Sequence, residues 1–356
     1  MVSRSCLHFS GIVIGVDTHK DEHLAVAVDH LGVHIGQRRL PTTDMGYAGL
    51  ERWASRLGKV GAFGVEGTGS YGAGLARFLT DRGHRVIEVS RPDRSTRRKL
   101  GKSYPIDAEM AARAVLAGVV QDPPKSGVDK VEMIRMLKST KDSAIKARTQ
   151  AINQMQALVV TAPDELRTEL RGLTTARLVA RCAGWRHGHL GTPTAAAKYA
   201  LWSLAQRHTQ LTKEIDVLDA ELARLTAAFA PALMKSFGIG PDTAAALLVT
   251  AGSNPERLKS EAAFAALCGV SPIPASSGKS NRHRLNRGGD RQANAALHRV
   301  VVVRLRYDDR TKAYLQRRIE EGLTKTEVIR CLKRYVAREV FAILHYLGKQ
   351  NTAQGT

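Results

Sequence analysis

One short apolar stretch, residues 11–20, constrains the fold of this chain more than any other. It reads Gly-Ile-Val-Ile-Gly-Val-Asp-Thr-His-Lys, and the β-branched run from Ile12 to Val16 is continuous. Such a run predicts a strand that is buried on both faces. Asp17 follows where the run stops. A carboxylate in that place is held by a rigid element yet reaches solvent, as a metal or phosphate site requires.

The elements that follow predict an α/β domain over residues 8–120. Two further strands, at His23–Asp29 and Val33–Leu40, complete an antiparallel meander with the first. Helices and strands then alternate, at residues 45–57, 62–66, 72–82 and 86–89. Right-handed crossovers would place the later strands parallel to the first strand and beside it. This order resembles the ribonuclease-H-like (RuvC-like) fold of nucleases, resolvases and transposases.

Two more acids are expected to meet Asp17. Glu66 ends the strand that would lie next to the first, and Asp107 lies just inside a helix that Pro105 helps to start. Acids from two strand ends and a helix start could hold two Mg²⁺ ions, and paired metals stabilise the attacking and leaving oxygens in phosphoryl transfer. The alternative is that Asp107 is only a first-turn acid favoured by the helix dipole.

A glycine-rich stretch in the same domain allows competing interpretations. Residues Gly67–Gly72 match GxGxxG between a strand and a helix, and Glu88 follows near the distance of a ribose-binding acid. An actin-like ATP-binding fold would explain both this stretch and Gly15–Lys20 as phosphate loops. Two observations argue against a dinucleotide-binding site. The antiparallel meander precedes this glycine-rich stretch in the chain, and the charge of Glu66 would repel a pyrophosphate. The glycines could also serve only to pack the helix close to the strand.

The charge of the chain predicts a polyanionic partner. Of its 356 residues, 54 are Lys or Arg and 33 are Asp or Glu, for a formal net charge of +21. Nucleic acid is the first choice for such an excess. Basic residues gather in a segment before Asp107 and in a polar loop near residue 280, where we expect contacts with phosphates. These residues are Arg91, Arg94, Arg97, Arg98, Lys99, Lys102, Lys279, Arg282, Arg284 and Arg287.

Membrane association and disulfide chemistry are not indicated. No apolar run approaches the roughly 20 residues that span a bilayer, and no signal-peptide segment precedes the first strand. The four cysteines are far apart without a CxxC spacing, so neither a zinc knuckle nor a disulfide framework is expected. We expect a cytoplasmic nucleic-acid protein with free thiols.

The middle of the chain, residues 121–230, predicts a linker and a coiled coil. Prolines over 122–127 end the preceding helix, and a long helix is expected over 129–160. A second long helix repeats leucine at every seventh residue, which is a heptad seam. Whether the two helices pair within one chain or between chains stays open. The seam leucines are Leu204, Leu211, Leu218 and Leu225.

The last part, residues 231–350, predicts a mostly α-helical domain. The turn Gly238–Pro241 opens a helix of small residues and looks like a helix-hairpin-helix element, whose backbone amides usually meet a DNA phosphate. A polar, glycine-rich and strongly basic loop follows over 270–290. A serine in this loop could attack a phosphodiester with arginines stabilising the pentavalent charge. Alternatively the serines only donate hydrogen bonds to DNA.

Taken in order along the chain, these motifs closely resemble the DEDD-type insertion-sequence transposases, also called bridge-RNA-guided recombinases. The resemblance covers nearly the whole chain. It rests on the coiled coil and on the motifs Gly15–Lys20, Val65–Gly69, Ile106–Ala108, Gly238–Pro241 and Ser277–Gly278.

The resemblance implies a specific chemistry. In that family a RuvC-like domain binds Mg²⁺ through acids, and a transposase domain supplies a serine that becomes linked to a DNA end. Asp17, Glu66 and Asp107 match the metal-binding acids, and Ser277 matches the nucleophile, with Ser276 second. The implied partners are donor DNA, target DNA and a structured noncoding guide RNA. A homo-oligomer, either a dimer or a tetramer, is also implied.

The sequence departs from the family at one place. The family has a further Asp three residues before the last acid, where this chain has Tyr104. A phenol does not replace a carboxylate as a Mg²⁺ ligand. The site could bind metal weakly, borrow Glu109, or belong to an inactive copy. Two alternatives to the recombinase therefore stay open: a metal-dependent junction nuclease without a covalent step, and a nucleic-acid-binding relic.

Overall fold

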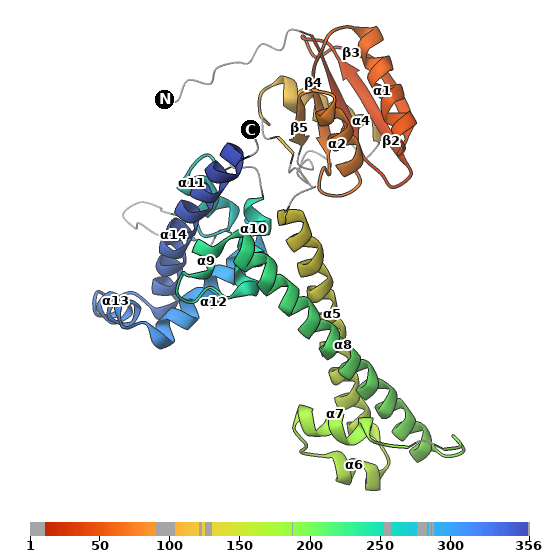
Figure 1. Cartoon of the computed structure of the whole chain (residues 1–356), viewed down its shortest axis with the longest axis vertical. Helices are drawn as coiled ribbons and strands as arrows, with labels where there is room; N and C mark the ends of the chain where they lie inside the picture. Colours follow the sequence, from red (N-terminus) through yellow and green to blue (C-terminus); the bar gives the residue numbers. More distant parts are fainter. Residues whose placement is uncertain are drawn as a thin grey trace. The chain divides into compact units, whose positions relative to one another are not determined.

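The computed structural model divides the chain into two compact units, residues 1–129 and residues 130–356. The long helices of the middle region belong to the same unit as the C-terminal helices, so the predicted division into three domains stays a prediction. Each unit is described here by itself (Figure 1). The structure describes residues 11–89, 104–120, 123–124, 130–186, 188–252, 258–275, 283–284, 286 and 288–354.

The first unit is built on one mixed sheet. Its strands have the order β3-β2-β1-β4-β5 within the described residues, with β1 antiparallel to β2 and parallel to β4. The predicted α/β class is therefore confirmed. The strands are β1 (Ile12–Asp17), β2 (Glu22–Val28), β3 (His34–Pro41), β4 (Val60–Glu66) and β5 (Val86–Val89). The helices are α1 (Asp44–Leu57), α2 (Ala73–Asp81) and α4 (Tyr104–Leu116).

Helices cover both faces of this sheet, which explains the unbroken apolar run of β1. Ile12, Ile14 and Val16 pack in one core with residues of α1 and α2. Val13 faces the opposite way and packs with residues of α4. Every residue of β1 is buried, as the sequence predicts. Strand β3 at the sheet edge is mostly exposed, and its sequence is correspondingly polar.

Two glycines let α4 lie close against the sheet. A Cβ atom on Gly15 would stand 2.0 Å from the carbonyl oxygen of Ala108 and 2.4 Å from the backbone nitrogen of Ala112. On the neighbouring strand, a Cβ atom on Gly64 would stand 2.8 Å from a methyl group of Val115. The backbone of α4 therefore occupies space that side chains fill at other strand positions, which fixes the helix over β1 and β4.

The second unit contains two long helices that run antiparallel within one chain, α5 (Lys130–Thr161) and α8 (Pro193–Phe229). Met155 near the end of α5 packs with Leu201 near the start of α8, and Ile134 shares a core with Leu222. Figure 1 shows the pair side by side, with α6 (Asp164–Leu170) and α7 (Thr175–Ala183) at its far end. The interpretation of this pair as a coiled coil stays a prediction.

The rest of the second unit is helical, with one small hairpin. Helix α10 is nearly all small and apolar, and residues 243–248 are buried in a core shared with α12 and α14. The hairpin pairs β6 (Ile273–Pro274) with β7 (His283–Arg284). The helices are α9 (Pro231–Met234), α10 (Pro241–Ala251), α11 (Glu261–Leu267), α12 (Arg291–Tyr307), α13 (Asp309–Glu320) and α14 (Lys325–Gln354).

A cluster of ion pairs joins α5 to α10. The Lys141 Nζ donates to Asp242 Oδ1 at 2.8 Å, and Lys138 Nζ lies 3.2 Å from the same oxygen. Arg299 pairs with the other carboxylate oxygen at 3.0 Å. Burial alone would raise the pKa of Asp242, but the hydrogen bonds and charges of these lysines outweigh it and lower that pKa. Asp242, beside the predicted helix-hairpin-helix turn, therefore neutralises cations of its own chain.

No helix among the described residues is long and apolar enough to cross a membrane. Three cysteines in this part of the chain are free thiols, as expected: Cys182, Cys268 and Cys331.

The close approach at Gly15 predicts that Gly15→Ala destabilises the first unit. The added methyl group meets backbone atoms that cannot rotate away, so we expect a loss of about 1–3 kcal/mol in unfolding free energy, as for overpacked cores. Hydrogen exchange of the β1 amides measures this loss separately from the second unit. Gly69→Ala is the matched control, because a Cβ atom there meets nothing within 4 Å. Equal exchange in both variants would contradict the packing argument.

Candidate functional site

Strands β1 and β4 end side by side with one acid each. Asp17 is the last residue of β1 and Glu66 is the last residue of β4. The strands are parallel, and Val16 pairs with Val65, so the two acids leave the sheet at the same edge. Only 7% of Asp17 and 6% of Glu66 is exposed. Two predicted site residues from separate strands are thus brought together by the sheet.

The third acid comes to this edge on α4. Asp107 lies in the first turn of the helix, directly before Ala108, whose carbonyl oxygen abuts Gly15 of β1. Asp107 is 5% exposed. Burial raises the pKa of Asp17, and the negative charge of Asp107 raises that pKa further. The two carboxylates are therefore near enough to repel each other.

A histidine that sequence reasoning missed supports Asp17. The Nε2 atom of His19 lies 3.1 Å from Asp17 Oδ2, and this contact opposes the rise in the pKa of Asp17. The backbone N–H of His19 donates to Nδ1 of His23 at 3.3 Å. Burial, together with the charge of His19, lowers the pKa of the fully buried His23 to about 4, so that ring is neutral at pH 7. The signal was present in the sequence, since His19 stands two residues after Asp17.

Thr18 and the glycine turn fasten the two strand ends. Thr18 Oγ1 donates to the carbonyl oxygen of Glu66 at 2.9 Å. Gly67 follows with φ of 64°, a conformation that favours glycine. A Cβ atom on Gly72 would stand 2.7 Å from the same Glu66 oxygen. Turn geometry and close packing thus account for these two glycines, which agrees with the packing interpretation of the GxGxxG stretch.

The donor set fits a hard divalent cation. Among the residues that the structure describes, no three His, Cys, Asp or Glu side chains are already arranged as a metal site. However, Asp17 and Asp107 are buried carboxylates that repel each other, a cost that a bound cation removes. Carboxylate oxygens are also the ligands that Mg²⁺ prefers. Asp17, Glu66 and Asp107 would hold such an ion.

Glu109 does not take the place of the expected fourth acid in this structure. Tyr104 is the first residue of α4, and its side chain lies outside the described part of the chain. Glu109, considered above as a substitute, is engaged elsewhere. Its carboxylate accepts a hydrogen bond from Arg113 at 2.6 Å and lies 3.2 Å from His34 Nδ1. The hydrogen bond from Arg113 is the main cause that lowers the pKa of Glu109.

The predicted nucleophile and most predicted DNA contacts lie outside the described residues. Arg284 is the exception: it is exposed on β7 and pairs with Ile273 of β6. In sequence, β6 comes shortly before the two serines and β7 comes shortly after them. The residues outside are Ser276, Ser277, Arg91, Arg94, Arg97, Arg98, Lys99, Lys102, Lys279, Arg282 and Arg287.

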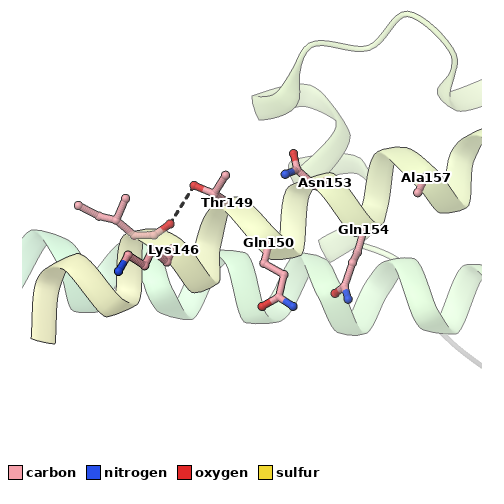
Figure 2. Close-up of a pocket in the computed structure, with 7 residues that line it drawn as sticks. Lys146, Thr149, Gln150, Asn153, Gln154 and Ala157 are labelled. Atoms are coloured by element: carbon pink, nitrogen blue, oxygen red, sulfur yellow. Dashed lines mark hydrogen bonds between the residues drawn. The ribbon is translucent and has the colours of Figure 1, made fainter. Parts of the chain in front are cut away.

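A shallow groove runs along α5 in the second unit (Figure 2). Its lining is mainly uncharged and polar, with a single cation at Lys146, and the Thr149 hydroxyl is bonded back to its own helix at Ile145. None of the predicted site residues lines it. The other lining residues are Gln150, Asn153, Gln154 and Ala157.

Comparison with known proteins finds family matches in two regions of the chain. A family model described as "Transposase", of the DEDD IS110 type, matches residues 14–163. A model described as "Transposase IS116/IS110/IS902 family" matches residues 230–316. A similar protein is the insertion element IS110 uncharacterized 43.6 kDa protein of Streptomyces coelicolor, 31% identical over 145 residues. That alignment covers 40% of this chain and 36% of the relative, so the chain spans little more than a third of the relative's length.

The fold of the first unit and these matches place the chain in the class of the DEDD-type transposases, whose N-terminal domains are ribonuclease-H-like. The first matched region contains Asp17, Glu66 and Asp107, and the second contains Ser277. The chain belongs to the IS110 family of insertion-sequence transposases.

The acid cluster predicts that Mg²⁺ stabilises the first unit. With Mg²⁺ about tenfold above its Kd, the gain is about 1.4 kcal/mol in unfolding free energy. Asp17→Asn removes one ligand together with its repulsion from Asp107, so the variant stays folded without metal and gains nothing from Mg²⁺. Thermal unfolding with and without Mg²⁺ measures the difference. Asp21→Asn, at an exposed position nearby, is expected to respond like the wild type. An equal response of Asp17→Asn would contradict the site.

Proposed function

We propose that the chain is an RNA-guided DNA recombinase of an insertion sequence, which cuts and rejoins DNA through a phosphoserine at Ser277. The observation that carries the proposal is the placement of three buried acids, at the ends of β1 and β4 and in the first turn of α4, inside the region that the DEDD transposase model matches. Buried like charges are costly, and phosphoryl transfer assisted by a divalent cation is the chemistry for which such a cluster is suited.

The acids would hold the cation with the help of their neighbours. Asp17, Glu66 and Asp107 are the ligands, and Mg²⁺, when bound, neutralises charge that develops on the reacting phosphate. His19 holds the Asp17 carboxylate through the contact of 3.1 Å, and Thr18 ties the end of β1 to Glu66 through the bond of 2.9 Å. These second contacts keep the ligands in place before DNA arrives.

Strand cleavage is an exchange of phosphoesters. The Ser277 Oγ forms a bond to phosphorus while the bond from phosphorus to one DNA oxygen breaks, and the serine proton passes to that leaving oxygen. The attack of another DNA hydroxyl on the phosphoserine later breaks the serine–phosphorus bond and restores Ser277. Each step replaces one phosphoester with another, so neither water nor a nucleotide is consumed.

The charge of the chain supports nucleic-acid partners of two kinds. A net charge of +21 suits donor DNA, target DNA and a structured noncoding guide RNA bound together. The basic segment at residues 91–102 precedes the helix that carries Asp107, and the basic loop contains Ser277, so both proposed reactive regions have cations nearby in sequence. We propose a homo-oligomer, a dimer or a tetramer, as the active form.

Ser277→Ala is expected to abolish a covalent protein–DNA adduct, because no Oγ remains to attack phosphorus. The measurement is denaturing gel analysis of labelled element-end DNA incubated with the protein, Mg²⁺ and the noncoding RNA encoded beside the gene. Ser276→Ala is the matched control and is expected to retain the adduct. An adduct that survives Ser277→Ala but not Ser276→Ala would move the nucleophile. Free cut ends without any adduct would indicate a junction nuclease instead.

A second candidate function is a nucleic-acid-binding transposase relic, which Tyr104 and the engagement of Glu109 by Arg113 favour. A site that lacks its fourth acid would bind the cation weakly, and binding of DNA would persist without strand transfer. This candidate and the recombinase differ in what restoring the acid does.

Tyr104→Asp distinguishes the two. If the chain is a relic, the variant gains strand transfer that the wild type lacks, because the carboxylate completes the ligand set. Tyr104→Asn is the control. Asparagine has nearly the shape of aspartate without its charge, so this variant is expected to gain no strand transfer. Strand transfer is measured with Mg²⁺, DNA and guide RNA at saturation. Clear activity of the wild type, unchanged or modestly changed by Tyr104→Asp, would reject the relic.

A further inference from the structure

A buried lysine on α14 has an unusual environment. Lys333 is 7% exposed, and its Nζ donates to Asn294 Oδ1 of α12 at 2.9 Å. Within the described residues this is its one hydrogen bond, and no acid pairs with it. Burial lowers the pKa of Lys333, and the nearby charge of Arg330 adds to this effect. Buried lysines are rare unless paired, because removing an ammonium group from water costs free energy. The hydrogen bond to Asn294 must offset this cost.

Asn294 also contacts the backbone, and so links Lys333 to it. Its Nδ2 donates to the carbonyl oxygens of Cys268 and Gly269, both at 3.0 Å. The opposite orientation of the amide would place its NH₂ group against the ammonium of Lys333 and its oxygen against two carbonyl oxygens. The lysine and the two carbonyls therefore favour the same orientation, in which Asn294 accepts from Lys333 and donates to both carbonyls.

These carbonyls come directly before residue 270 in the chain. The sequence 270–289, which contains both serines, is called the nucleophile loop, and the structure describes its two ends, residues 270–275 and 288–289. Its two ends meet: a Cβ atom on Gly289 would stand 2.1 Å from the backbone nitrogen of Gly269, which has φ of 65°. The Asp290 N–H donates to the Leu267 carbonyl oxygen at 2.7 Å. The loop thus starts and ends at one point, and Asn294 binds its entering strand there.

The leaving end of the loop, at Asp290, has hydrogen bonds of its own. Asp290 caps α12 by accepting from the backbone of Gln292 and Ala293, and its other oxygen accepts from Thr250 of α10 at 3.1 Å. The leaving end therefore has its own links to α12 and α10. The entering end has backbone bonds to α11, and Asn294, held by Lys333, adds the side-chain link from Cys268 and Gly269 to α12.

We propose that Lys333, acting through Asn294, is a positioning residue for the nucleophile loop. It holds the entering end of the loop against the leaving end, and these two ends fix where the chain enters and leaves the sequence that contains Ser277. This inference rests on the proposed role of Ser277, which lies between these two ends in the sequence. Positioning of this kind matters because a misplacement of about 1 Å can cost about 100-fold in rate.

Two variants remove different contacts in the series that runs from Lys333 through Asn294 to the backbone carbonyls. Lys333→Met keeps an unbranched apolar stem in the helix and removes the ammonium group. Asn294→Asp is nearly isosteric and keeps an acceptor for Lys333, but it loses both donors to Cys268 and Gly269. Should the methionine variant fold poorly, the aspartate variant still tests the link. The matched control is Arg330→Met, which removes an exposed charge from the same helix.

The first readout does not depend on catalysis. Hydrogen exchange of the full chain follows the amides of Val270 and Asp290, which bond to Ala265 and Leu267 across the base of the loop. Both Lys333→Met and Asn294→Asp are expected to exchange faster at these amides and at the wild-type rate in α10. Arg330→Met is expected to match the wild type throughout.

The second readout separates positioning from DNA binding. At saturating DNA and guide RNA, the single-turnover rate of adduct formation is expected to fall by up to about 100-fold in both variants. The DNA Kd is expected to stay within about twofold, with an unchanged dependence on salt. A structural defect elsewhere would change both quantities, whereas a positioning defect changes the rate alone.

Three results would overturn the inference. One is unchanged exchange at Val270 and Asp290 in both variants. Another is a weaker Kd with a shallower salt dependence in Lys333→Met, which would make Lys333 a direct phosphate contact. A third is faster exchange at the loop base with an unchanged adduct rate. If the wild type forms no adduct at Ser277, the proposed function fails, while the exchange measurement still shows whether Lys333 anchors the loop.

Discussion

The close approach of α4 to β1 at Gly15 is the constraint on which the candidate site depends. The backbone of the helix lies where a side chain of the strand would otherwise be, with Ala108 and Ala112 against the glycine. Asp107 precedes the contact by one residue, so the depth of the helix sets how near its carboxylate comes to Asp17. A larger residue at position 15 would lift the helix away from the sheet edge.

This arrangement of acids costs stability. The sheet and α4 place Asp17 and Asp107 together in a buried environment, where burial and mutual repulsion raise the pKa of Asp17. A protein under selection for stability alone would not keep this pair. Nearby bonds partly offset the cost: His19 contacts Asp17, and Thr18 bonds to the backbone of Glu66. A divalent cation would relieve the same repulsion, and this relief would favour its binding.

Much of the first unit could be predicted from the sequence because local signals were strong. The β-branched run predicts the buried strand, and the ends of parallel strands meet at one edge, so Asp17 and Glu66 could be placed without coordinates. The contact of His19 with Asp17 and the contacts of Glu109 could not be predicted from the sequence. Glu109 was open as a substitute ligand, but its contacts with Arg113 and His34 depend on how α4 is turned over the sheet.

The second unit shows where sequence patterns lose detail. The heptads predict the seam of α8, yet Leu204 and Leu211 are only half-buried, whereas the interleaved Ile215 and Leu222 are buried. The partner helix decides this, since α5 offers small residues such as Ala144 on the contact side. Lys333 gave no signal, because its contact with Asn294 joins two helices and no motif marks it.

The most direct test of the acid site is an anomalous-scattering map of crystals of the full chain grown with Mn²⁺. We predict a Mn²⁺ peak with oxygen atoms of Asp17, Glu66 and Asp107 within about 2.5 Å, the range of carboxylate ligation of hard cations. A map with no peak between these carboxylates, or with the ion on other acids such as Glu109, would contradict it.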